Sequence, residues 1–223
     1  MEPAEQISQW SDRLRDMAAI GLMYSQNQYD RQNYAELQDM AMRMLAFAAG
    51  VPAEQIEPLR ATLFSRPTPL TTGDAAIFDA QGRLLLIQRS DNRKWAFPGG
   101  ALEVGETPAQ GTLREALEET GLACEALELI GVHDSRLCGS KSPYHLYMFL
   151  FLCRPLNGAE PGVASHAEER LDMRWFGEHE LPPGEALDPG HISRIPLAFQ
   201  AWKERQAAYF DQPADPPVHS SRI

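Results

Sequence analysis

Apolar residues recur at helical spacing in two segments near the start of the chain. Residues 4–23 and residues 31–49 each carry large apolar side chains at intervals that place them on one helical face. These positions are Ile7, Trp10, Leu14 and Met17, and then Leu37, Met40, Met44 and Phe47. The pattern predicts two amphipathic helices.

Polar and turn-forming residues set the limits of this helical region. Asp30 is the candidate N-cap of the second helix and Gly50 its stop, and Pro52 can start a shorter third helix. The two prolines of Arg66-Pro67-Thr68-Pro69 disfavour both helix and sheet, which is typical of a linker. We therefore expect a small all-α domain over residues 1–66, whose limited core would dock on a further surface.

Beyond the linker the pattern changes to short apolar runs. Residues 74–78 and 84–87 flank a turn at Asp79–Gly82 and predict a β-hairpin. Residues 127–132, 144–152 and 173–176 predict further strands, and the polar segment 134–143 between two of them predicts a loop. Ile192, Ile195, Phe199 and Trp202 predict one C-terminal helix. The tail, residues 211–223, is too polar and proline-rich to pack, so we expect disorder there.

Residues 97–122 form the stretch with the strongest helix-end signals. A glycine-containing loop precedes a helix with Thr107 as N-cap, Pro108 at its first position and Gln110 completing a capping box. Gly121 is the expected residue just past the helix end. Leu113 and Leu117 share one face and would dock on a core.

The opposite face of this helix carries Glu115, Glu118 and Glu119 in its last turns. Negative charge near a helix C-terminus is disfavoured by about 0.3–1 kcal/mol, and the three carboxylates also repel one another. A divalent cation such as Mg²⁺ or Mn²⁺ would relieve this arrangement, because both prefer oxygen ligands. The alternative is a solvated acidic face with an Arg114–Glu118 ion pair.

Composition and charge argue against several classes of protein. The chain has 223 residues and a net charge of −11, which disfavours electrostatic binding to nucleic acid or an anionic membrane. Its first 65 residues hold nine acidic and five basic side chains, so the helical region does not resemble a DNA-binding module. No apolar run reaches membrane-helix length, and the start lacks a signal peptide. The three cysteines lack metal-site spacing, and we expect a cytoplasmic location.

The spacing of Gly100, Glu106, Arg114-Glu115, Glu118-Glu119 and Gly121-Leu122 resembles the Nudix box of the Nudix hydrolase family. The resemblance implies an α/β fold, a Nudix α/β/α sandwich with a mixed β-sheet over residues 67–210. It also implies Mg²⁺- or Mn²⁺-dependent hydrolysis of a nucleoside diphosphate linked to another group, X. Residues 10–25 and 68–78 are similar to two-domain bacterial members, which implies a homodimer formed through the N-terminal helices.

Roles carry over by position in the box. The resemblance implies that Glu115, Glu118 and Glu119 bind metal, with Glu118 and Glu119 also catalytic. Glu106 matches an auxiliary ligand, and Gly99 matches a position whose carbonyl oxygen can bind metal. Arg114 matches the arginine that orients the glutamates.

Other candidates lie outside the box. In relatives the general base often lies on a late loop, and Glu169 is our choice among Glu168, Glu169 and Asp172; a solvent-exposed acidic loop is the alternative. Arg89 could bind a phosphate or form a surface ion pair. Trp95 could stack on a base or pack beside the Pro98-Gly99 corner. His133, His145 and His166 show no ligand spacing.

The leading hypothesis is an enzyme that converts a small nucleotide, such as ADP-ribose or CDP-choline, into a nucleoside monophosphate and X-phosphate. One alternative is a pyrophosphohydrolase for nucleoside triphosphates or RNA 5′ ends. An alternative of another class is a non-catalytic nucleotide-sensing regulator, for which eroded glutamates would be typical, whereas here the box is intact.

Overall fold

A computed structural model describes residues 3–65, 69–141, 145–156, 164–166 and 169–212. The chain divides into two compact units. Residues 1–69 with 103–105 form the first, called here the helical unit, and the other residues form the second, called here the α/β unit. The predicted limits at residues 66 and 210 stay predictions. No helix in the described part of the chain combines the length and apolar character needed to cross a membrane.

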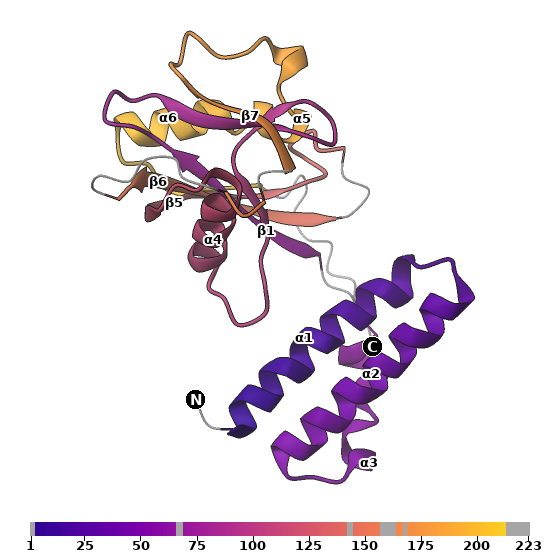
Figure 1. The fold of residues 1–223 in the computed structure, drawn as a ribbon. Coiled ribbons are helices and arrows are strands. Elements are labelled where there is room, and N and C mark those ends of the chain that lie inside the picture. Colours follow the sequence, from indigo (N-terminus) through magenta and orange to yellow (C-terminus); the bar gives the residue numbers. More distant parts are fainter. Residues whose placement is uncertain (1–2, 66–68, 142–144, 157–163, 167–168, 213–223) are drawn as a thin grey trace. The chain divides into compact units, whose positions relative to one another are not determined.

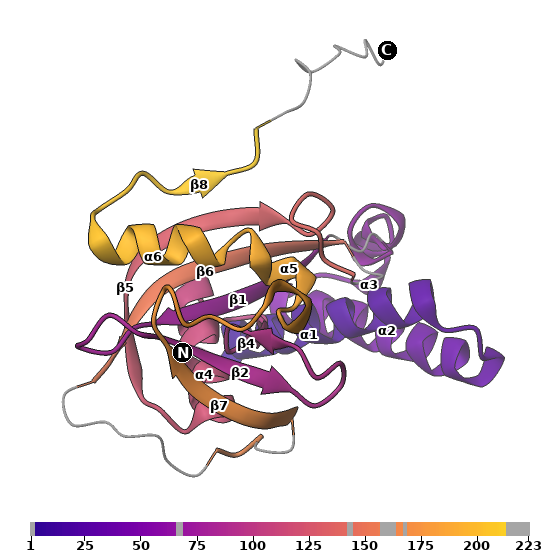
Figure 2. The same cartoon turned by 90° about the horizontal axis from the view of Figure 1, so that it is seen from above.

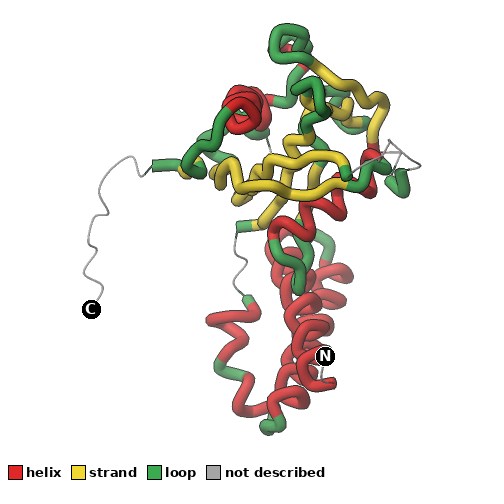
Figure 3. Tube along the Cα trace, turned by 90° about the vertical axis from the view of Figure 1, so that its left-hand side faces the viewer, coloured by secondary structure: helices red, strands yellow, loops and turns green. Residues whose placement is uncertain are grey.

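The helical unit contains the predicted helices (Figure 3, red tube at the N-terminal end). Helix α1 spans Pro3–Tyr24, α2 spans Gln28–Ala49, α3 spans Ala53–Ile56, and a π-helix spans Arg60–Phe64. Asn27, not Asp30, caps α2, because its side chain accepts a hydrogen bond from the Tyr29 N–H. Gly50 ends α2 in the left-handed conformation, as predicted.

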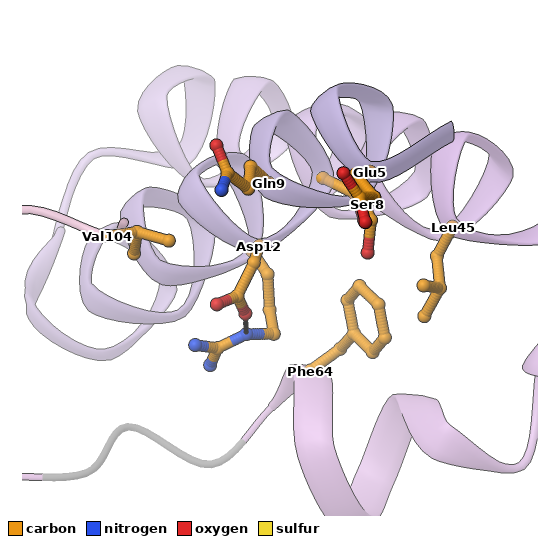
Figure 4. A pocket seen from close by; sticks show the side chains of 9 residues that line it. Glu5, Ser8, Gln9, Asp12, Leu45, Phe64 and Val104 are labelled. Atoms are coloured by element: carbon orange, nitrogen blue, oxygen red, sulfur yellow. Dashed lines mark hydrogen bonds and ion pairs between the residues drawn. The ribbon is translucent and has the colours of Figure 1, made fainter. Parts of the chain in front are cut away.

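Small and apolar side chains form the core of this unit. Ala41, Met42, Ala46, Ile56 and Phe64 are buried together. Beside them lies a pocket of about 650 Å³ whose lining includes Glu5, Ser8, Gln9 and Asp12 of α1 together with Leu45 and Phe64 (Figure 4). The pocket contains none of the site residues predicted from the sequence.

Two β-sheets form the centre of the α/β unit. The larger one is mixed and has the strand order β4-β1-β6-β5-β8, with β1 parallel to β6 and antiparallel to β4. Its strands are β1 (Leu70–Ile77), β4 (Gly99–Ala101), β5 (Cys124–Asp134), β6 (Leu146–Pro155) and β8 (Tyr209–Phe210). The smaller one has the order β3-β2-β7, formed by β2 (Leu84–Arg89), β3 (Trp95–Ala96) and β7 (Arg170–Phe176). Figure 2 shows β2 and β7 side by side.

The predicted hairpin of residues 74–78 and 84–87 is wrong. The two segments enter different sheets, β1 in the larger and β2 in the smaller. A bridge between Phe78 and Leu84 connects their ends, and Asp79 and Arg83 form hydrogen bonds to each other across the turn. Each strand is buried on both faces, and such strands carry continuous apolar runs. A one-sided hairpin would instead alternate apolar and polar residues.

Helices cover both faces of the strands (Figure 1). Helix α4 (Pro108–Thr120) packs on one side, where Ala75, Ile77 and Leu85 are buried with Ala116. Helix α6 (Ile195–Lys203) packs on the other side, where Ala76, Phe78, Leu84 and Phe199 are buried. Alternate residues of β1 and β2 thus point to opposite cores. The arrangement confirms the expected α/β sandwich with a mixed sheet.

The predicted C-terminal helix is split in two. Helix α5 covers Pro189–Ile192, after a 3₁₀ turn at Gly184–Ala186, and α6 begins at Ile195. Pro196 has no N–H to donate back to the preceding turn, so it fits the first turn of a new helix rather than the interior of a longer one. Ile192 is consequently 43% exposed.

Beyond α6, β8 pairs in parallel with β5, and the Asp211 carboxylate accepts a hydrogen bond from the Asp134 N–H at 2.6 Å. The predicted tail therefore makes an ordered contact at its first residue. Residues 213–223 lie outside the described part of the chain.

Candidate active site

The caps of α4 are those predicted from the sequence. The Thr107 hydroxyl accepts from the Gln110 N–H at 3.3 Å, and the Gln110 side chain accepts from the Thr107 N–H at 2.9 Å. Gly121 follows the helix in the left-handed conformation, with φ of 68°. Leu113 packs on the core, but Leu117 is 47% exposed. The smaller Thr112 and Ala116 are buried instead, which allows α4 to approach β1 closely.

Arg114 is the centre of an ion-pair network on the acidic face of α4. Its Nε and Nη2 donate to the two carboxylate oxygens of Glu106 at 2.7 and 3.1 Å. Its Nη1 donates to Glu115 at 2.8 Å and to Glu118 at 3.0 Å, and Nη2 also donates to the Ala101 carbonyl at 3.0 Å. One guanidinium thus joins three of the predicted metal ligands to the preceding loop.

Glu119 lies outside this network and is only 7% exposed. Its Oε2 accepts a hydrogen bond from the Gly99 N–H at 2.8 Å. Burial raises the pKa of the Glu119 carboxyl to about 8. The charges of Glu115, Glu169 and Asp74 raise this pKa further, while the hydrogen bond from Gly99 lowers it. Burial likewise raises the pKa of Glu115.

Two glycines bring the loop backbone close to these carboxylates. A Cβ atom on Gly99 would lie 2.3 Å from the Gly73 carbonyl oxygen, and φ at Gly99 is 156°. A Cβ atom on Gly100 would lie 2.5 Å from Oε2 of Glu115. Any larger residue at either position would displace the loop from the glutamates.

The donors on this face suit a hard divalent cation. They are carboxylate oxygens and a loop carbonyl, and their mutual repulsion is part of the cause of the raised pKa of Glu119. No three acidic, histidine or cysteine side chains of the described residues already converge as a ligand cluster. Glu115 and Glu118 would therefore have to turn from Arg114 toward a cation.

Glu169 is exposed. Its charge contributes to the raised pKa values of both Glu115 and Glu119, as a carboxylate close to the acidic face would. Its carboxylate has no hydrogen-bond partner among the described residues. Asp172, an alternative to it, forms an ion pair with Arg174 at 2.6 Å. Glu168, the other alternative, lies outside the described residues.

Two residues near the site were not selected from the sequence. The His166 N–H donates to the Glu118 carbonyl at 2.9 Å, and its Nδ1 lies 3.7 Å from Oε2 of Glu118. Nε of Arg170 donates to the Glu119 carbonyl at 2.5 Å, which places a cation at the C-terminal end of α4. Both come from a segment distant in sequence, and no local pattern marks them.

A cleft of about 630 Å³ lies beside the loop of Gly99 and Gly100. Its walls come from β1, from the segment between β2 and β3, and from α5 with the residue that precedes α6. Arg89 lines the cleft and forms an ion pair with Asp91 at 2.7 Å. The structure thus places the phosphate-binding candidate beside the glycine loop.

Trp95, the candidate for base stacking, lies in the core. It is 8% exposed, and its ring packs edge-on against Phe176 at 5.0 Å. It is not among the residues that line the cleft. Packing in the core therefore accounts for this side chain.

Comparison with known proteins agrees with this geometry. Residues 69–197 match the NUDIX domain, so the chain belongs to the Nudix family. Residues 5–59 match a second family, described as the UDP-X-like N-terminal oligomerisation domain. The chain is therefore a two-domain Nudix protein and a pyrophosphohydrolase, acting on phosphoric anhydride bonds, and Nudix hydrolases generally use divalent metal ions.

Three similar proteins define the neighbourhood of the chain within this family. YjhB of Bacillus subtilis (strain 168), provisionally named an ADP-ribose pyrophosphatase, is 32% identical over 175 residues, which are 78% of this chain and 81% of YjhB. The crystal structure of a UDP-X diphosphatase is 26% identical, with a TM-score of 0.58 over 93% of this chain and 99% of that one. An ADP-ribose pyrophosphatase from Streptococcus suis is 28% identical, with a TM-score of 0.52 over 62% of this chain and 96% of that one.

Proposed function

We propose that this protein hydrolyses a nucleoside diphosphate linked to X, such as ADP-ribose or CDP-choline, into a nucleoside monophosphate and X-phosphate. The observation that carries the proposal is the carboxylate face of α4 beside a cleft whose lining includes four cationic side chains and three aspartates. The similarity of both domains to a UDP-X diphosphatase, and of most of the chain to YjhB, supports this substrate class.

The ligands for Mg²⁺ or Mn²⁺ would be Glu115, Glu118 and Glu119, with Glu106 and the Gly99 carbonyl as auxiliary donors. When bound, such cations neutralise the oxygens of a pyrophosphate and lower the pKa of bound water. Arg114 would keep the carboxylates on one side of α4, because its guanidinium already joins Glu106, Glu115 and Glu118. The buried Glu119 would be fixed by its hydrogen bond from Gly99.

Glu169 would accept the proton of the attacking water. Its exposed carboxylate has no hydrogen-bond partner among the described residues, and its charge contributes to the raised pKa values of Glu115 and Glu119. Arg89 would hold a phosphate of the substrate in the cleft, where Asp91 keeps its guanidinium in place. With these roles, the anhydride of the substrate would lie between the glycine loop and the segment that joins β2 and β3.

Substitution of the glutamates tests the proposal directly. We expect Glu118→Gln and Glu119→Gln to reduce hydrolysis of ADP-ribose by more than about 100-fold with Mg²⁺ or Mn²⁺, since a carboxylate that binds the metal is lost. Glu125→Gln is the matched control, because Glu125 pairs only with the exposed Arg154 in the described structure. Full activity of either α4 variant would contradict the proposal.

A substrate panel separates the remaining activities. We expect turnover of ADP-ribose, CDP-choline or another such compound to exceed that of nucleoside triphosphates and of 5′-triphosphorylated RNA. A preference for triphosphates or RNA would reverse the substrate assignment. Binding of nucleotides without turnover of any of them would support a regulator instead.

We also propose that the protein is a homodimer formed through its N-terminal helices. Trp10, Met17, Met40 and Phe47 are between 41% and 76% exposed on α1 and α2. Trp10 and Met17 are seven residues apart, as are Met40 and Phe47, so each pair shares one helical face. The match to an oligomerisation domain supports a second copy of this chain as the partner.

A further inference from the structure

Arg194 is a fully buried arginine at the junction of α5 and α6. Its side chain is 1% exposed, and two of its three nitrogens have fixed partners. Nε donates to the Gly190 carbonyl at 2.8 Å, and Nη1 donates to Oδ2 of Asp74 at 2.5 Å. Nη2 is buried and has no hydrogen-bond partner in the described structure.

This arrangement is not explained by stability. A buried donor without a partner is destabilising, and native structures retain few of them. A buried ion pair is itself weak evidence for stability, because desolvation of both charges offsets their attraction. A chain that keeps both features on one side chain points to a ligand that completes the hydrogen bonding of Nη2.

The position of Arg194 indicates which ligand this is. Arg194 lines the cleft beside Gly99 and Gly100. The other charged residues of the lining are the cations Arg89, Lys94 and Lys141 and the carboxylates Asp74, Asp91 and Asp188. Arg89 is held by Asp91, and the Lys94 ammonium donates to the Glu185 carbonyl. Lys141 is exposed to solvent, whereas Arg194 places at the wall of the cleft a buried guanidinium with one nitrogen that has no described partner. Shielding from bulk water is the condition in which a charged hydrogen bond is strongest.

We propose that Arg194 binds an anionic phosphoryl oxygen of the ligand through Nη2. The choice of a phosphoryl group rests on the proposed function, whereas the assignment of an anion site rests on the geometry of the cleft. Asp74 and the Gly190 carbonyl act as positioning groups, because they orient the guanidinium without using Nη2.

Asp74 also connects this site to the glycine loop. It lies opposite Gly99 in the β1–β4 pair, and a Cβ atom on Gly99 would be 2.9 Å from Oδ1 of Asp74. Asp74 thus pairs with Arg194 through its carboxylate and lies opposite Gly99, whose N–H donates to Glu119, through its backbone. The ligand anion and the acidic face of α4 are thereby held in fixed register.

Binding of inorganic phosphate and of AMP to the full chain in metal-free buffer tests the anion site, measured by calorimetry. Two variants remove Nη2 in different ways. Asp74→Leu/Arg194→Met removes both charges, so no unpaired charge stays buried. Arg194→Lys keeps the charge beside Asp74 but loses the fork of three nitrogens. Arg154→Met removes an exposed arginine that pairs with Glu125 and is the matched control.

We expect the double variant to weaken the binding of both probes at least tenfold, and Arg194→Lys at least threefold, with Arg154→Met unchanged. The Michaelis constant for ADP-ribose should rise by similar factors with kcat within threefold, whereas a purely structural role would lower the melting temperature and leave the Michaelis constant unchanged. Arg194→Lys decides alone if the double variant does not fold.

Wild-type affinity for phosphate and AMP in the folded variants would overturn the assignment, as would a wild-type protein that binds neither probe. Nη2 would then have an internal partner, such as a water shared with the unpartnered Nε2 of His133. Loss of probe binding in a protein that hydrolyses no NDP-X compound would keep the anion site and reject the proposed function. Hydrolysis of ADP-ribose by the variants with unchanged Michaelis constants would keep the proposed function and reject the anion site.

Discussion

The two units of the chain differ in which side chains lie in an unfavourable environment. The helical unit exposes large apolar side chains, with Trp10 at 54% and Phe47 at 76% exposure. The α/β unit buries charged ones, with Arg194 at 0% and Glu119 at 7% exposure. Covering exposed apolar area with an apolar partner lowers the free energy. A buried charge is instead stabilised by an opposite charge or a bound ion. We therefore expect the first unit to associate through its exposed apolar residues and the second to bind ions.

After the substitutions of Glu118 and Glu119, the largest expected effect concerns Arg114 in the α/β unit. Arg114→Met removes the only described cation that contacts Glu106, Glu115 and Glu118 together. The loss of charge-assisted hydrogen bonds of about 1.5–3 kcal/mol predicts a decrease in kcat/KM of about 10- to 100-fold. Steady-state kinetics with ADP-ribose measure it. Activity equal to that of Arg154→Met would mean that the network is not needed for catalysis.

The exposed apolar residues of the helical unit are tested by association. We expect Trp10→Ser and Phe47→Ser each to raise the dimer dissociation constant at least about tenfold, since each removes more than about 1.4 kcal/mol of apolar burial. Light scattering over a concentration series measures the change. Phe210→Ser, which alters a 61% exposed phenylalanine of the α/β unit, is the control. A wild-type protein that is itself a monomer would mean that these exposed apolar residues do not mediate self-association.

Close packing of α4 on β1 predicts a smaller effect on stability. A Cβ atom on Gly73 would lie 2.0 Å from Oγ1 of Thr112, so Gly73→Ala forces helix and strand apart. We expect a loss of about 1–3 kcal/mol in the free energy of unfolding. Denaturant unfolding measures it, with Gly184→Ala as the control because nothing lies within 4 Å of its added methyl group. Equal stability of the two variants would contradict the close approach.

The smallest effect is a pH dependence from a buried histidine. Burial, and then the charge of Arg194, lower the pKa of His133 to about 4. Below its ordinary value of about 6.5 the unfolded chain binds a proton that the folded protein does not, so stability falls as the pH falls. Between pH 6.5 and 5.5 this amounts to about 1 kcal/mol. His133→Phe should make the unfolding free energy less dependent on pH over this interval. An unchanged pH dependence would mean that another titratable group causes it.

Local signals made the helix ends and the acidic face predictable. Thr107, Gln110 and Gly121 act through neighbours a few residues away, and the spacing of the glutamates places them on one face. The long helices of the helical unit follow from periodicity alone. The same periodicity overestimated the C-terminal helix, because it ignores the N–H that Pro196 lacks.

Contacts between distant segments could not be predicted in this way. The apolar runs around residues 74–78 and 84–87 do not encode which sheet each strand joins. Asp74 and Arg194 meet only after β1 and α5 pack together, and His166 meets Glu118 through a loop far along the chain. Trp95 carries no local mark that separates core packing from base stacking, and only its buried contact with Phe176 does so.

The proposed chemistry depends on the binding of a divalent cation by the acidic face of α4. Direct measurement of Mn²⁺ binding by electron paramagnetic resonance tests it on wild-type protein and on Glu118→Gln, Glu119→Gln and the control Glu125→Gln. We predict that each α4 substitution weakens Mn²⁺ binding at least about tenfold, through loss of a carboxylate ligand, while the control stays within about twofold. Equal affinity in all four proteins would mean that the acidic face of α4 is not the cation site.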